Sequence, residues 1–253
     1  TTRLRSFPAT IEGSLQIGTS GGVGSEFNTS GLDVSIGADL INYSTATTNN
    51  VYARITNTQN TIFNGKNENQ AIINNSATIL RFGNLIIDNY QSGGTVTFQG
   101  SGAAIFVEGD FTIYGKFHQS NNKQVYILGN IYNFGLHSSN NNDAYLVFRS
   151  TTVTQNIFGS SLSTFGSIRI IAGNPLVVSN VNLRIDNQIN FGANTKIYIS
   201  QKKLILTPSA TIINYNDNQY ILTNGALSDA GVTKEWSGTG SFTFPVGVAG
   251  KYT

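Results

Sequence analysis

The sequence predicts an all-β fold, a single-stranded parallel β-helix with coils of about 20 residues, on three observations. Residues 105–124 (IFVEGDFTIYGKFHQSNNKQ) are followed without a gap by the related residues 125–144 (VYILGNIYNFGLHSSNNNDA), and a third copy begins at 145–148 (YLVF). The apolar residues form short β-branched and aromatic runs separated by Gly, Asn or Asp, which is typical of strands. Charged residues make up only 11% of the chain, so Asn, Thr, Ser and Gln must carry the surface. A fixed period of this kind indicates coils that bury their apolar faces on one another, and right-handed winding is the expected hand.

Glycine and asparagine recur at fixed places in the repeated unit and predict its corners. At the 20-residue offset the stacked pairs are Gly109 on Gly129, Gly115 on Gly135, Asn121 on Asn141, and Asn122 on Asn142. We expect the glycines where the chain bends or adopts a positive φ. The asparagines are expected to form side-chain amide ladders, since Asn tolerates the left-handed conformation of such corners. Ladders of this kind indicate stacked coils and do not by themselves indicate a ligand.

The chain divides into a predicted β-helix at residues 1–222 and a different segment at 223–253. Between the repeats, residues 66–78 (KNENQAIINNSAT) are expected to form a protruding loop, because the spacing of two related motifs differs here. After residue 222 the charge becomes more clustered, and Pro245 interrupts an apolar run. Proline cannot donate to a central ladder. Residues 223–253 are therefore predicted to be a C-terminal cap or the start of a following β module.

Composition argues against several classes of function. The net charge is +2 and the sequence contains no basic stripe with interleaved aromatic residues, so nucleic acid is not an expected partner. The apolar runs are far shorter than a membrane span, so membrane insertion is not expected. The absence of cysteine excludes disulfides and zinc-thiolate sites. The absence of both sulfur residues suits a protein exposed outside the cell. The chain begins TTRLRSFPAT, without an initiator Met or a signal-peptide pattern, which is expected of a processed chain or a fragment.

Three motifs resemble a known class of surface protein. They are Gly-Ser-Leu-Gln-Ile-Gly at 13–18, the units QNTIFNG and QNIFG, each followed by a Phe-Gly segment, and Gly-Ser-Phe-Thr-Phe-Pro-Val-Gly at 240–247 with Tyr252 shortly after. This pattern resembles repeat regions of large secreted surface proteins of Bacteroidetes, including gliding-motility adhesins that the type IX secretion system exports. The resemblance implies an extracellular adhesin or filament-like module within a longer polypeptide, with the type IX machinery as an export partner.

Candidate ligand-binding residues are aromatic. Tyr90, Tyr132 and Tyr145 are expected to be exposed and, with neighbouring Asn and Gln amides, to offer a surface for carbohydrate. The positions of Tyr114 with Phe134, and of Tyr126 with Phe111, are instead expected to be stacks inside the coil.

The sequence offers little support for catalysis or metal binding. Carboxylates do not stack at the 20-residue offset, so Asp110 and Asp186 are expected to make local turn hydrogen bonds rather than act as an acid/base pair. His118 and His137 lie near one corner on adjacent coils without a carboxylate partner, and no metal or cofactor is expected. The Asn-rich segments 140–143 and 214–218 lack the glycine and distal glutamate of a calcium loop and are interpreted as stacked turns.

These observations favour a non-enzymatic extracellular adhesin or surface-structural module at the cell surface. Its expected partners are surface polysaccharide or other cell-surface components, with self-association or contacts to neighbouring domains of the same chain as further options. Two alternatives stay open. One is a filament subunit that polymerises end to end, because open solenoid ends expose strand edges. The other is a polysaccharide lyase or glycoside hydrolase built on a β-helix.

Overall fold

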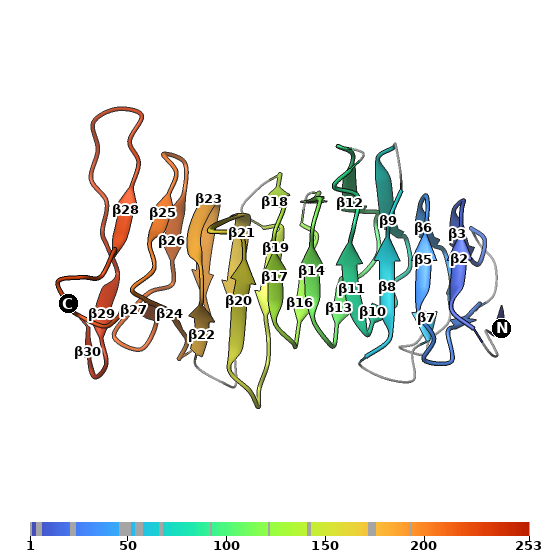
Figure 1. Cartoon of the computed structure of the whole chain (residues 1–253), viewed down its shortest axis with the longest axis horizontal. Helices are drawn as coiled ribbons and strands as arrows, with labels where there is room; N and C mark the ends of the chain where they lie inside the picture. Colours follow the sequence, from blue (N-terminus) through green and yellow to red (C-terminus); the bar gives the residue numbers. More distant parts are fainter. Residues whose placement is uncertain are drawn as a thin grey trace.

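The computed structural model describes residues 2–3, 7–20, 24–45, 52–53, 58–65, 68–91, 93–120, 122–140, 143–171, 176–192 and 194–252. These residues form strands, turns and bends and include no helix. The strands lie across the long axis and follow one another along it from the N-terminus to the C-terminus (Figure 1). Successive strands pair in parallel from coil to coil, so the predicted parallel β-helix is confirmed. The hand of the winding stays a prediction.

Each coil crosses three faces, which we number in chain order. The first face contains β1 (Thr2–Arg3), β4 (Phe27–Asn28), β7 (Tyr52–Ala53), β10 (Leu80–Phe82), β13 (Ile105–Val107), β16 (Val125–Ile127), β19 (Tyr145–Phe148) and β26 (Thr211–Ile213). The second face contains β2 (Ala9–Ile11), β5 (Val34–Ile36), β8 (Asn60–Phe63), β11 (Asn84–Ile87), β14 (Phe111–Ile113), β17 (Ile131–Asn133), β20 (Gln155–Gly159), β22 (Leu176–Ser179), β24 (Lys196–Ser200), β27 (Tyr220–Thr223), β29 (Val246–Val248) and β30 (Lys251–Tyr252). The third face contains β3 (Leu15–Ile17), β6 (Leu40–Asn42), β9 (Gln70–Asn74), β12 (Thr95–Gln99), β15 (Lys116–Gln119), β18 (Leu136–Ser139), β25 (Leu204–Leu206) and β28 (Val232–Lys234). Two long strands, β21 (Leu162–Ile170) and β23 (Asn182–Phe191), begin on the third face and end on the first.

The 20-residue register is confirmed in the repeated unit on all three faces. Ile105 pairs with Val125, Phe111 with Ile131, and Lys116 with Leu136. Many other coils are longer, and the largest offset within the paired strands joins Leu40 to Ile72, 32 residues later. The 20-residue period therefore describes the repeated unit, while coils both before and after it carry insertions.

The prediction of a protruding loop at residues 66–78 is wrong. Residues 70–74 form β9, which pairs in parallel with β6 and β12 on the third face. Ile72 is fully buried, and the buried Asn74 accepts a hydrogen bond at its Oδ1 from Asn42 Nδ2 at 2.9 Å. The Asn and Gln residues of this segment resemble a polar loop in the sequence. The side chains of Gln70 and Asn74 instead lie inside the coil, where Gln70 Nε2 donates to the carbonyl oxygens of Ile36 and Ala38.

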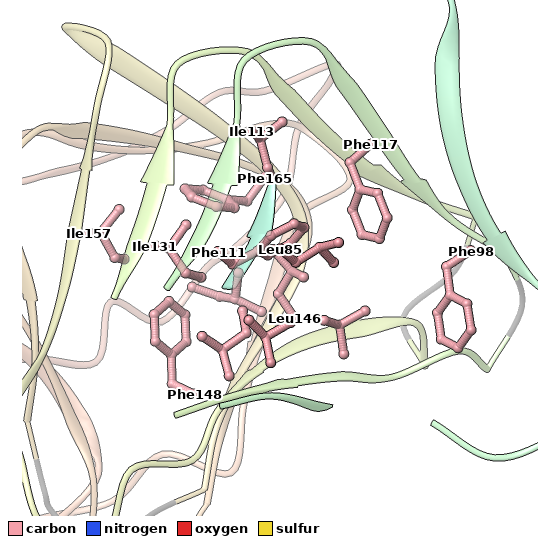
Figure 2. Packing of buried hydrophobic residues seen from close by; sticks show 14 of the residues in the cluster. Leu85, Phe98, Phe111, Ile113, Phe117, Ile131, Leu146, Phe148, Ile157 and Phe165 are labelled. Carbon is pink, nitrogen blue, oxygen red and sulfur yellow. The ribbon is translucent and has the colours of Figure 1, made fainter. Parts of the chain in front are cut away.

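The core is a continuous column of inward-facing aliphatic and aromatic side chains. Strand alternation builds this column, as in β14, where Phe111 and Ile113 are buried and Thr112 points outward. Figure 2 shows these side chains filling the space that the strands enclose. The largest fully buried side chains are Phe63, Phe82, Phe98, Phe111, Phe117, Phe148, Phe165 and Phe191.

Most of the predicted amide ladder lies outside the described residues. Asn121, Asn141 and Asn142 are outside the described residues, while Asn122 is exposed and has the left-handed φ of 57° expected at such a corner. A polar ladder lies where the strands of the second face begin, and its members are Asp33, Asn60, Asn84, Asp110, Asn130 and Asn156. In this ladder each side-chain oxygen accepts a hydrogen bond from the next coil. This arrangement fixes the stacking register along the axis.

The four predicted corner glycines lie at bends, as expected. Gly109, Gly115, Gly129 and Gly135 lie between strands, and none has a positive φ. The requirement is close approach between coils. A Cβ on Gly135 would lie 1.9 Å from the Gly115 carbonyl oxygen, and one on Gly129 would lie 2.3 Å from the Gly109 oxygen. Glycine is needed at these two positions because backbone meets backbone there.

This contact yields a stability prediction. Gly135→Ala is expected to lower the free energy of unfolding by about 2–3 kcal/mol, because the added methyl group must separate two stacked backbones. Gly13→Ala is the matched control, because a Cβ at Gly13 meets nothing within 4 Å. Chemical denaturation of both variants measures the effect. Equal stability of the two variants would contradict the close-approach explanation.

Residues 223–252 add to the solenoid. In this segment β28 pairs in parallel with β25, β29 pairs in parallel with β27, and β30 folds back antiparallel on β29. Lys234 anchors the segment, because its Nζ donates to the carbonyl oxygens of Thr207, Pro208 and Ala210 at 2.6, 2.9 and 2.7 Å. Across the described part of the chain, no helix has the length and apolar character needed to cross a membrane.

Candidate functional site

A largely apolar surface pocket lies at the corner between the second and third faces. It has a volume of about 220 Å³ and is lined by Asn89, Tyr90, Gly93, Gly94, Tyr114, Gly115, Lys116, Gly135 and Leu136. These residues come from three successive coils. The corner glycines, which lack side chains, leave the aromatic rings beside them accessible.

Two aromatic rings form a platform beside this pocket. Tyr114 and Phe134 stack with ring centroids 5.3 Å apart and an interplanar angle of 10°. Each side chain is 45% exposed, so the expectation that they lie inside the coil is wrong. They follow the last inward residue of β14 and β17 and precede a corner glycine, and the bend turns them outward. Their stacking follows from the coil spacing of about 4.8 Å.

Tyr90 completes the aromatic group and is exposed as predicted, at 59%. It lies in the turn after β11, where its hydroxyl accepts a hydrogen bond from Gln91 Nε2 at 2.8 Å. Lys116 Nζ donates to the Gly93 carbonyl oxygen at 3.1 Å and ties this turn to β15. The pocket therefore combines ring faces with an amide and an ammonium group.

The other two predicted ligand-binding tyrosines lie elsewhere. Tyr132 is half-buried on the outside of the second face and stacks on Phe158 at 5.0 Å. Tyr145 is only 4% exposed, so its predicted exposure is wrong. Its hydroxyl donates to Gln188 and accepts from Asn190 Nδ2 at 3.1 Å, and burial raises its pKa. Tyr145 is thus engaged by side chains of β23 on the same face and is not available to a ligand.

Tyr126 and Phe111, the second pair expected inside the coil, lie on opposite sides of the coil wall. Phe111 is buried as predicted and meets Phe117 edge to face, with centroids 5.2 Å apart. Tyr126 is the middle residue of β16, so it points outward and stacks on Phe106 at 4.6 Å.

The two histidines lie on opposite sides of the third face. His137 is fully buried between Phe117 and Phe165, with ring centroids 6.1 and 6.0 Å away. Its Nε2 lies 2.8 Å from Gln119 Oε1, and its Nδ1 accepts from the Gly166 backbone N–H at 3.2 Å. A neutral ring satisfies both contacts, and burial lowers the pKa to about 3.

His118 lies on the outside, where its Nδ1 is 2.9 Å from Ser138 Oγ. The two imidazoles therefore do not converge on one ion. Among the described residues, no group of three or more His, Cys, Asp or Glu side chains is placed to hold a metal ion.

The two candidate acids are apart and differently engaged. Asp110 Oδ1 accepts a hydrogen bond from the backbone N–H of Asn130 at 2.7 Å, so its expected local turn bond is replaced by a bond to the next coil. Asp186 pairs with Arg184 Nε at 3.3 Å. In the Asn-rich segment 214–218, Asn214 has a left-handed φ of 59° and donates to Asn190 Oδ1 of the preceding coil at 3.0 Å. This contact agrees with the interpretation of that segment as a stacked turn.

The fold defines the class of this protein as a parallel β-solenoid. Comparisons of the chain with protein-family models, with curated proteins and with solved structures found no match. The resemblance to secreted surface proteins of Bacteroidetes therefore rests on the quoted sequence motifs and stays a prediction.

Proposed function

We propose that this protein is a non-enzymatic module of the cell exterior that binds surface polysaccharide through its aromatic corner. The observation that carries the proposal is the stacked, exposed pair of Tyr114 and Phe134 next to Tyr90 and the 220 Å³ pocket. A sugar ring presents an apolar C–H face and hydroxyl groups at its rim. An aromatic platform with nearby polar groups complements both features.

The scaffold supports this function by fixing the rings before a ligand arrives. The backbone N–H groups of Tyr114 and Phe134 donate to the carbonyl oxygens of Ile87 and Ile113 in the preceding coil, each at 2.8 Å. Rings held in this way lose little conformational freedom on binding, which lowers the entropic cost of association. The parallel stack also repeats its surface along the axis, which suits an extended polymer.

The candidate acids support a binding role rather than cleavage. Asp110 belongs to the inter-coil ladder, and Asp186 pairs with an arginine. The polysaccharide-cleaving enzyme and the end-to-end filament subunit stay as the alternative functions, and an unchanged chain length of the bound polysaccharide would argue against the first. Export by the type IX machinery and attachment within a longer polypeptide belong to the proposal through the sequence resemblance.

Tyr114→Ala is expected to weaken binding to a neutral surface polysaccharide about tenfold, because one face of the platform is lost. The matched control is Tyr198→Ala, which removes a half-buried tyrosine from the outside of β24, away from the pocket. Binding of both variants to an immobilised glycan panel measures the effect. Unchanged binding of the Tyr114 variant to every glycan that the native protein retains would contradict the proposed site.

A further inference from the structure

The outer side of the first face carries a cluster of arginines and aromatic rings. Arg81 of β10, Phe106 of β13 and Tyr126 of β16 are register partners in three successive coils. Arg149 follows β19, and Arg169 lies on β21. We call these five residues the arginine face. This cluster cannot be recognised in the linear sequence, because its members come together only when the coils stack.

The rings of the arginine face position the guanidinium groups. Phe106 and Tyr126 stack at 4.6 Å, and the Arg81 guanidinium carbon lies 4.8 Å from the Phe106 centroid. The guanidinium carbon of Arg149 lies 5.3 Å from Phe106 and 5.1 Å from Tyr126. Phe106 is only 8% exposed, so its ring is covered rather than offered to a ligand. This face therefore presents to solvent guanidinium groups whose positions are fixed by the rings beneath them.

Two of these cations have no anionic partner within the described part of the chain. Arg81 pairs with Glu108 at 3.0 Å. The side chains of Arg149 and Arg169 make no hydrogen bond or ion pair with any described residue, and the buried Arg169 Nε lacks a hydrogen-bond partner. Arg169 lies over the ring of Tyr145 at 6.0 Å, and the charge of Asp143 also acts on that tyrosine. Arg149 and Arg169 thus leave positive charge on this face.

We propose that the arginine face binds an acidic polysaccharide, a linear chain carrying carboxylate or sulfate groups. A guanidinium presents a planar fork of N–H donors that matches these anions in paired hydrogen bonds. Pre-positioning by the rings reduces the side-chain entropy lost on binding. Single-stranded nucleic acid fits less well, because its bases need open aromatic faces, and those of Phe106 are occupied. The inference extends the proposed polysaccharide binding to a second site with its own ligand chemistry.

The test compares binding of the full chain to polygalacturonate, a sulfated polysaccharide and neutral dextran. The double variant Arg149→Gln, Arg169→Gln is expected to lose at least about tenfold in affinity for the acidic chains, because charge-assisted hydrogen bonds are removed. Arg149→Lys keeps the charge and loses the planar fork, so it is expected to lose several-fold affinity while remaining folded. Lys202→Gln, on an exposed turn, is the control for removing one positive charge and is expected to bind as the native protein does.

The outcomes separate this inference from the proposed function. Tyr114→Ala is expected to affect neutral glycans and to leave binding of polygalacturonate unchanged. Equal binding of the native protein and the arginine variants to both acidic chains would overturn the inference, as would equal loss in the Lys202 control. Tighter binding to a single-stranded oligonucleotide than to either acidic chain, lost in the arginine variants, would assign the face to nucleic acid instead.

Discussion

Phe111→Ala is expected to lower the free energy of unfolding by about 3–5 kcal/mol, the largest stability effect among the changes considered. Phe111 is fully buried in the repeated unit and contacts the edge of Phe117. Its strand β14 pairs with β11 and β17, so the cavity left by the missing ring would weaken the packing against both neighbouring coils. A solenoid has no distant contacts that could compensate, because each coil is stabilised only by its neighbours.

The control for this prediction lies on the same strand. Thr112→Ala removes an outward-facing side chain and is expected to change stability by about 0.5 kcal/mol or less. Urea denaturation monitored by circular dichroism measures both variants. Similar midpoints for the two would show that the inward and outward sides of β14 are assigned wrongly.

The second large effect is a loss of stability in acid caused by His137. Burial lowers the pKa of its imidazole from 6.5 to about 3, so the unfolded chain binds a proton more readily than the folded chain. The stability is fully present above the pKa of the unfolded histidine and falls as the pH drops from there towards 3. The expected loss is about 1.4 kcal/mol per pH unit, or about 2–3 kcal/mol by about pH 4.5.

His137→Gln tests this account, because an amide can occupy the site without titrating. The variant is expected to lose most of the acid dependence, whatever its stability at neutral pH. His118→Gln changes the outward-facing histidine and is expected to keep the native acid dependence. Thermal unfolding measured between neutral pH and about pH 4.5 compares the three proteins. If the curves of the His137→Gln variant and the native protein fall in parallel, His137 is not the group responsible.

The fold was predictable from sequence because stacking imposes its period on the residues. The pairs of Gly109 with Gly129 and of Asp110 with Asn130 are separated by 20 residues, and these positions meet in adjacent coils. Strand runs such as 111–113 also showed their alternation directly. In contrast, the polar segment containing β9 resembled a loop, because amides that are hydrogen-bonded to the backbone inside a coil look identical in sequence to amides in solvent.

The candidate sites were less predictable, because they depend on orientation at corners and on contacts between coils. Tyr114 directly follows the inward Ile113, so strand alternation alone would place it outward, but its aromatic side chain suggested a place in the core. Tyr145 is covered by Gln188 and Asn190, which lie more than 40 residues later. The arginine face was not predictable either, because only the stacking of coils brings Arg81 and Arg149 to the same ring.

The most direct test of the account measures polysaccharide binding and polysaccharide integrity in the same experiment. The native protein is incubated with a panel of neutral and acidic polysaccharides, bound material is quantified, and chain length is determined afterwards. We expect retention of at least one polysaccharide at unchanged length, with weaker retention of neutral chains by the Tyr114→Ala variant. Failure to retain any polysaccharide would contradict the binding function, and shortened chains would show that the protein is an enzyme.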